Sequence, residues 1–72
     1  MGTKKIIICT GKYESFGFII SKLQAIGAII SKRNFDEDWK RYEIITELDA
    51  VQTEVMLDFV IPIGGVLLEA ES

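Results

Sequence analysis

Histidine is absent from the sequence, and cysteine occurs once, as Cys9. Without histidine, a Ser/His/Asp catalytic set cannot form. One cysteine cannot close a disulfide within the chain, and without histidine it cannot contribute to a four-ligand zinc site. Gly11-Lys12 has neither the glycine nor the spacing of a phosphate-binding loop. We therefore expect a non-enzymatic protein with no catalytic residue, no metal site and no cofactor.

Basic residues are absent after Arg41. Residues 1–41 hold eight basic and four acidic residues, whereas residues 42–72 hold seven acidic residues and no basic one. Nucleic-acid backbones are bound through lysine and arginine, which release counterions on binding. The acidic balance of this chain, with a net charge of -3, therefore argues against nucleic acid as a partner.

Long apolar runs are also missing. The longest, residues 59–68, is about half a membrane span and is broken by Pro62 and by Gly64-Gly65, so no membrane segment is expected. No targeting signal is visible, because the apolar run that follows the first basic pair is too short for a signal peptide. Together with a lone thiol, these features predict a cytoplasmic protein.

The chain is short enough to form one domain, residues 1–72. A domain of this size buries only about 60% of the surface that its unfolded chain exposes, so its stability is marginal unless something adds to it. No disulfide or metal does so here, yet 49% of the residues are hydrophobic. We expect self-association to supply part of the missing burial.

The hydrophobic pattern predicts four strands and two helices. Stretches rich in β-branched and apolar residues predict strands at residues 5–10, 29–35, 39–48 and 66–70. Apolar residues at helical spacing predict a first helix between Ser15, as its N-cap, and Gly27. A second helix begins after Asp49, which has Gln52 at the capping-box spacing, and ends before Pro62. Its expected apolar stripe is Val51, Val55, Met56, Phe59 and Val60.

The order strand–helix–strand–strand–helix–strand is that of the ferredoxin-like, split βαβ arrangement. It predicts an α+β fold with a four-stranded antiparallel sheet of order 4-1-3-2 and two helices on one face. The acidic turn 36–38 makes strands two and three a hairpin. The other sheet face has no helix, and Ile7, Cys9 and Ile45 are candidates to point towards it, although an apolar strand also favours a buried Cys9. An uncovered apolar sheet face is commonly an interface.

A glycine opens the first predicted helix, and an apolar pattern follows it. The pattern is Phe16-Gly17-Phe18-Ile19-Ile20, then Leu23, then Ile26-Gly27-Ala28-Ile29-Ile30. It resembles the ACT domain family, which has a similar size and topology, although Ser15 and Phe16 replace the acidic residue and proline usual there. The resemblance implies a regulatory module that dimerises and often binds amino acids near the loop after the first strand.

That loop, residues 10–15, is also a candidate from its own chemistry. Backbone amides at the start of a helix, together with a lysine, can hold an anion or a carboxylate. The alternative is an ordinary loop with a capping serine and a surface lysine. The candidate ligand-binding residues are Thr10, Gly11, Lys12, Ser15 and Gly17.

The charge asymmetry supplies a second set of candidates. In the predicted strand order, Lys32 and Arg33 lie on one edge strand and acidic residues lie on the other. Lys40 and Arg41 are expected opposite the first pair, which makes a cluster of four cations. Charges on sheet edges usually prevent pairing, but opposite charges on two edges can also promote edge-to-edge association or bind a charged partner. The candidate interaction residues are Lys32, Arg33, Trp39, Lys40, Arg41, Glu69 and Glu71.

Three functional hypotheses follow from these observations. The first is a protein-interaction or regulatory module that acts as a homodimer through its open sheet face or its edge strands. The second is an ACT-type sensor of an amino acid or anion that uses residues 10–15. The third is a small inhibitor or adaptor that docks on a larger protein.

Overall fold

The fold was obtained as a computed structural model, which describes residues 2–70. The elements follow the order β1 (Lys4–Thr10), α1 (Tyr13–Ala25), β2 (Ile29–Asp36), β3 (Arg41–Leu48), α2 (Ala50–Val60), the 3₁₀ turn η1 (Ile61–Ile63) and β4 (Gly65–Glu69). Within the described residues, neither helix has the length and apolar character needed to cross a membrane.

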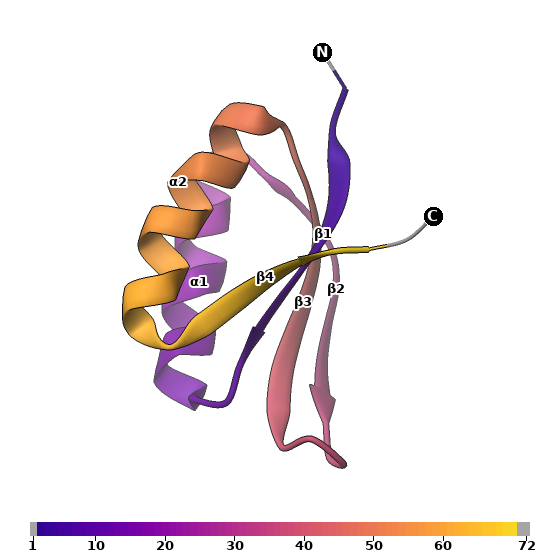
Figure 1. Ribbon diagram of the computed structural model, residues 1–72, viewed down its shortest axis with the longest axis vertical. Coiled ribbons are helices and arrows are strands. Elements are labelled where there is room, and N and C mark those ends of the chain that lie inside the picture. The colour runs from indigo at the N-terminus through magenta and orange to yellow at the C-terminus, as the bar shows by residue number, and fades with distance from the viewer. Residues whose placement is uncertain (1, 71–72) are drawn as a thin grey trace.

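The four strands form one antiparallel sheet in the order β2-β3-β1-β4. This is the predicted order read from the other edge, and the arrangement is compatible with a ferredoxin-like fold. Both helices lie on the same side of the sheet, which leaves the opposite face without a covering layer (Figure 1). The predicted edge strands, β2 and β4, are confirmed.

Local capping interactions close the start of α2 and the end of α1. The predicted capping box of α2 is present: the Asp49 carboxylate accepts from the Gln52 amide N–H, and the Gln52 side chain accepts from the Asp49 N–H. At the end of α1, Gly27 has a φ of 75°, and Ala28 N–H donates to the carbonyl of Leu23. This glycine-terminated motif is the one that the sequence predicts.

The predicted start of α1 is wrong. The helix begins at Tyr13, with Lys12 as an N-cap that makes no side-chain capping bond. Ser15 lies inside the first turn, where its buried hydroxyl donates to the carbonyl of Ile63 at 2.7 Å. A serine hydroxyl near the start of a helix can hydrogen-bond either to the backbone of its own helix or to a neighbouring segment. Here the acceptor is a carbonyl of the neighbouring turn η1.

The hairpin also differs from its prediction. Trp39 and Lys40 belong to the turn and not to the third strand, because β2 extends to Asp36 and β3 begins only at Arg41. The carboxylate of Asp36 accepts from the backbone N–H groups of Asp38 and Trp39. The turn therefore covers residues 37–40, whereas the sequence pattern predicts residues 36–38.

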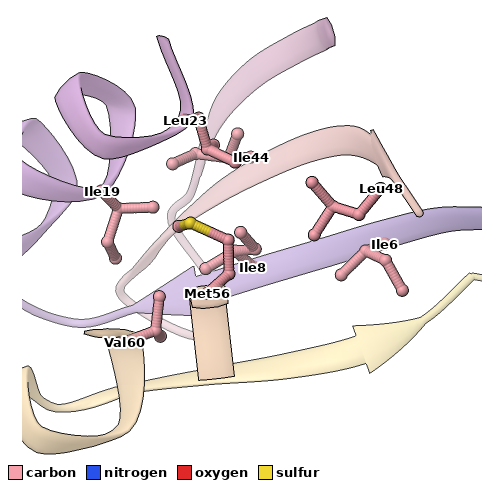
Figure 2. Packing of buried hydrophobic residues seen from close by; sticks show 8 residues of the cluster. All are labelled: Ile6, Ile8, Ile19, Leu23, Ile44, Leu48, Met56 and Val60. Carbon is pink, nitrogen blue, oxygen red and sulfur yellow. The ribbon is translucent and has the colours of Figure 1, made fainter. Parts of the chain in front are cut away.

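The core lies between the helices and the sheet (Figure 2). Its eight fully buried residues come from β1, β3 and both helices: Ile6, Ile8, Ile19, Leu23, Ile44, Leu48, Met56 and Val60. Within the predicted stripe of α2, Met56 and Val60 are buried, but Val51 is 73% exposed, so its placement in the stripe was wrong. Val51 lies about 140° around the helix axis from Met56, on the outer side of α2, where it borders a surface hollow with Glu54 and Asp58.

Gly65 marks the closest approach between α2 and the sheet. A Cβ atom at this position would lie 2.5 Å from Cγ1 of Val60 and 3.1 Å from the carbonyl oxygen of Cys9. We predict that Gly65→Ala lowers the free energy of unfolding by about 1–3 kcal/mol, because β4 must move away from Val60. Urea denaturation measures the change.

Gly17 provides the matched control. It lies within α1, and a Cβ atom there would meet nothing within 4 Å. Gly17→Ala should therefore raise the free energy of unfolding by up to about 1 kcal/mol, through helix propensity alone. Equal effects of the two substitutions would contradict the close approach at Gly65.

Candidate functional site

The sheet face opposite the helices is the main candidate. Side chains alternate along a strand, and Ile6 and Ile8 of β1 enter the core. The intervening residues, Lys5, Ile7 and Cys9, therefore belong to the open face. The register extends this face across the sheet, because residues paired in an antiparallel ladder share a side.

An apolar strip crosses the middle of this open face. Ile7 pairs with Ile45 of β3 on one side and with Leu68 of β4 on the other, and Val66 lies next to Leu68 on the same face. Val66 and Leu68 are 48% and 46% exposed, while Ile7 and Ile45 are partly exposed. We call these four residues, Ile7, Ile45, Val66 and Leu68, the apolar strip. Of the three residues that the sequence assigned to this face, Ile7 and Ile45 form part of the strip and Cys9 lies beside it.

Charges of both signs surround the apolar strip. Lys5 lies opposite Glu47, and Lys32 lies opposite Ile45 at the β2 edge. At the hairpin end, the guanidinium of Arg41 lies 3.2 Å from the carboxylate of Glu43. Within residues 2–70, neither Lys5 nor Glu47 takes part in an ion pair of 4 Å or less. Lys5 and Glu47 are thus cross-strand neighbours of opposite charge whose charged atoms lie more than 4 Å apart, and the Glu47 carboxylate accepts from the Thr3 hydroxyl at 3.4 Å.

Cys9 is buried, as predicted, but it lies outside the core cluster. It is 3% exposed and pairs across the ladder with Glu43 and Val66. Burial raises the pKa of the thiol from its ordinary value of 9.0; the positive charge of Arg41 opposes this shift, and Glu43 and Asp36 reinforce it. A neutral, buried thiol is a poor nucleophile, so Cys9 acts here as a small apolar side chain.

The two hydroxyl groups among the predicted ligand-binding residues make hydrogen bonds within the protein. The Thr10 hydroxyl accepts from the Lys12 N–H at 3.1 Å and lies 3.5 Å from the carbonyl of Gly64, to which it donates. The Ser15 hydroxyl is bonded to the carbonyl of Ile63. Both hydroxyls therefore tie the end of β1 and the start of α1 to the segment before β4.

The predicted ligand residues do not share one cavity. Lys12 and Ser15 line a hollow of about 540 Å³ at the start of α1, whereas Gly17 lines a different one, of about 490 Å³, that reaches Arg33. Thr10 and Gly11 border a third, of about 170 Å³. A small ligand is held by polar groups that converge on it, and these five residues do not converge. Ligand binding by this loop stays a prediction.

The predicted cluster of four cations is not formed. Lys32 pairs with Ile45, while Arg33 pairs with Ile44, a core residue, so the two cations point to opposite sides of the sheet. Arg41 pairs with Asp36, and Lys40 lies in the turn. The prediction failed because consecutive residues of a strand alternate sides, and because the turn covers residues 37–40, which places Arg41 opposite Asp36 and not opposite Arg33.

The acidic edge is also neutralised in part by its own chain. Glu69 forms an exposed ion pair with Lys4 at 3.2 Å. Exposed pairs of this kind contribute little to stability, but the pair removes one free charge from the β4 edge. Glu71, the other predicted acidic residue of this edge, lies outside the described residues.

The hairpin tip presents Trp39, which is 73% exposed. The guanidinium carbon of Arg41 lies 5.9 Å from the centre of the Trp39 ring, within the range of a cation–π interaction. Lys40, between them, has a φ of 53°, the left-handed region that few residues other than glycine favour.

An aromatic cluster around Tyr42 was missed from the sequence. The Tyr42 ring lies 4.8 Å from those of Phe16 and Phe35 and 5.7 Å from that of Tyr13, measured between centroids. These aromatics come from α1, β2 and β3, at the hairpin end of the helix layer. The alternation of Tyr42 with Ile44 indicates its side of the sheet, but only the helix position brings Tyr13 and Phe16 above it.

Comparison with known proteins yields no relative: no protein-family model and no curated protein matches the sequence.

The left-handed conformation of Lys40 leads to a prediction on stability. Lys40→Gly should raise the free energy of unfolding by about 0.5–1 kcal/mol, because glycine adopts this φ without a Cβ clash. Chemical denaturation followed by circular dichroism measures it. Glu37→Gly, in the same turn at a negative φ, is the control and should lower stability; a loss in both variants would refute the strain at Lys40.

The raised pKa of Cys9 leads to a prediction on pH dependence. Above pH 9.0 the unfolded chain loses the thiol proton while the folded chain retains it, so the unfolded state binds fewer protons. Stability should therefore fall as pH rises above 9, with a slope of at most about 1.4 kcal/mol per pH unit from this group. Cys9→Ala should show a shallower decline in urea titrations at pH 8 to pH 10. Parallel declines in the two proteins would show that the thiol is not protected by folding.

Proposed function

We propose that this protein is a ferredoxin-like, non-enzymatic interaction module that works as a homodimer, formed through the open sheet face. The observation that carries the proposal is the apolar strip, which lies at the centre of a sheet face that neither helix covers. Contiguous apolar surface on a small protein is typical of an interface.

The size of the chain supports association. A single helix layer on one sheet face leaves the domain with a core of eight fully buried residues. Covering the apolar strip removes further apolar surface from water, at about 25 cal/mol for each Å² buried. Association through this face therefore buries apolar side chains on the side of the sheet that neither helix covers.

The charges on the open face favour a second copy as the occupant. The face carries the cations Lys5, Lys32 and Arg41 and the anions Asp36, Glu43 and Glu47. Three charges of each sign make this surface neutral, although the whole chain has a net charge of -3. A neutral face with mixed charges is complementary to itself, whereas a partner of one charge sign would meet repulsion from half of these groups.

Leu68→Lys tests the proposal. Leu68 lies on an edge strand and is 46% exposed, so a lysine there is compatible with the folded monomer but places a charge in the middle of the interface. We expect the wild-type protein to sediment mainly as a dimer at a protein concentration of about 100 µM, which requires a dissociation constant of about 10 µM or lower, or about -6.8 kcal/mol. Leu68→Lys should sediment as a folded monomer at the same concentration.

Val51→Lys is the matched control. Val51 is an exposed valine at the start of α2, on the helix side of the sheet. This variant adds the same charge and removes similar apolar surface, and it should remain dimeric. A wild-type protein that is monomeric at about 100 µM would refute the proposal. A dimer that Val51→Lys disrupts and Leu68→Lys does not would move the interface to the helix layer.

A further inference from the structure

The pattern of charges on the open face specifies how two copies face each other. We infer that the twofold axis of the homodimer runs along the strand direction, between β1 and β3, and pairs Lys5 of each copy with Glu47 of the other. This inference rests on the proposed function, because it needs the two open faces to be in contact.

The register gives a map of the open face. The first row across β3 and β1 is Glu47 and Lys5, and the next is Ile45 and Ile7. The third row is Glu43 and Cys9. Two sheets that pack face to face with their strands aligned, about a twofold axis in the interface, can have that axis along the strands or across them. The two choices bring different rows and strands together.

An axis along the strands places β1 of one copy over β3 of the other and keeps each row in its place. Lys5 then faces Glu47 of the second copy, and this contact occurs twice because the interface is symmetric. Ile7 faces Ile45 of the second copy, so these two residues of the apolar strip pack against each other, while Leu68 and Val66 of β4 lie over Lys32 and Asn34 of β2 in the second copy. Lys5 and Glu47, which lie side by side within each copy, then each gain a second neighbour of opposite charge from the other copy.

An axis across the strands places each strand over the same strand of the second copy. It also reverses the order of the rows, so that the first row of one copy lies over the third row of the other. Glu47 then faces Glu43 of the second copy, and Lys32, in the central row, faces its own counterpart. Like charges placed opposite one another in an interface are unfavourable. Charge complementarity therefore selects the axis along the strands.

This arrangement has a consequence for the hairpin tips. In Figure 1 the β2–β3 hairpin and the start of β1 lie at opposite ends of the molecule. An axis along the strands keeps both hairpins at the same end, so the dimer presents two Trp39 side chains side by side. An axis across the strands sends the two hairpins to opposite ends.

The first test uses two variants of opposite charge. Lys5→Glu places two carboxylates on this row of each copy, and Glu47→Lys places two lysines there. Each variant alone should form a dimer with a dissociation constant at least roughly tenfold higher than that of the wild type. An equimolar mixture should recover the wild-type affinity as a heterodimer. In it, the glutamate introduced in one copy faces the lysine introduced in the other, and the unchanged Glu47 and Lys5 also face each other across the axis.

A control pair separates this contact from a general effect of net charge. Lys22→Glu on α1 and Glu54→Lys on α2 carry the same charge changes on the helix side of the sheet. Each should dimerise like the wild type, alone or mixed. If this mixture gained affinity as much as the first one, net charge would be the cause and the inferred contact would be overturned. Circular dichroism of each variant confirms that it is folded.

The second test measures the tips directly and does not disturb the charged row. Asp38→Cys in a Cys9→Ala background takes one nitroxide label at the exposed tip, and dipolar spectroscopy gives the distance between the two copies. Strand and sheet spacings place the tips roughly 15 Å apart for an axis along the strands. For an axis across the strands they are about 40 Å apart, comparable to the 35 Å longest extent of the molecule.

The outcomes distinguish the two proposals. A wild-type monomer overturns the proposed function and this inference with it. A dimer that Leu68→Lys disrupts, but that has distant tips and no recovery on mixing, leaves the proposed function intact and overturns only the axis. Close tips together with recovered affinity support both.

Discussion

Strand β1 is the constraint on which the rest of the structure depends. It is a central strand, paired with β3 on one side and β4 on the other, and its apolar residues are consecutive. Because side chains alternate, packing Ile6 and Ile8 beneath the helices forces Ile7 and Cys9 to the opposite side. Neither helix covers that side (Figure 1). The helix-covered core and the exposed apolar strip are thus two results of the same apolar strand.

The polar side chains that follow β1, which the sequence offers as a ligand site, make hydrogen bonds within the fold instead. Thr10 and Ser15 have hydroxyls in a loop before a helix, a pattern that also suits an anion site. Their bonds to the carbonyls of Gly64 and Ile63 instead fasten this loop to the segment that leads into β4. Gly65 completes the junction by allowing β4 to approach Val60. The loop thus positions β4, and β4 supplies half of the apolar strip.

Electrostatic interactions contribute little to the stability of this protein. The ion pairs of the described residues, Lys4–Glu69 and Arg41–Glu43, lie at the surface or only partly buried. The sequence is strongly divided into a basic part and an acidic part, but strand pairing mixes them: β3 brings Glu43 and Glu47 next to β1 and β2. The open face is therefore neutral within an acidic chain, which is the property on which the proposed self-association rests.

By itself, the sequence determined the order of the elements, the capping box at Asp49 and the glycine end of α1, because each depends on residues close together in the chain. The order of strands in the antiparallel sheet followed from that element order and the right-handed crossover rule. The tertiary structure decided what depends on distant segments. The partner of Ser15 is 48 residues away, and the aromatic cluster around Tyr42 needs α1 placed over the hairpin. The hairpin register pairs Arg41 with Asp36, and strand alternation sets Lys32 and Arg33 on opposite faces, so the expected cation cluster does not form. A local pattern cannot specify register, and a shift of one residue reverses the side on which every later side chain lies.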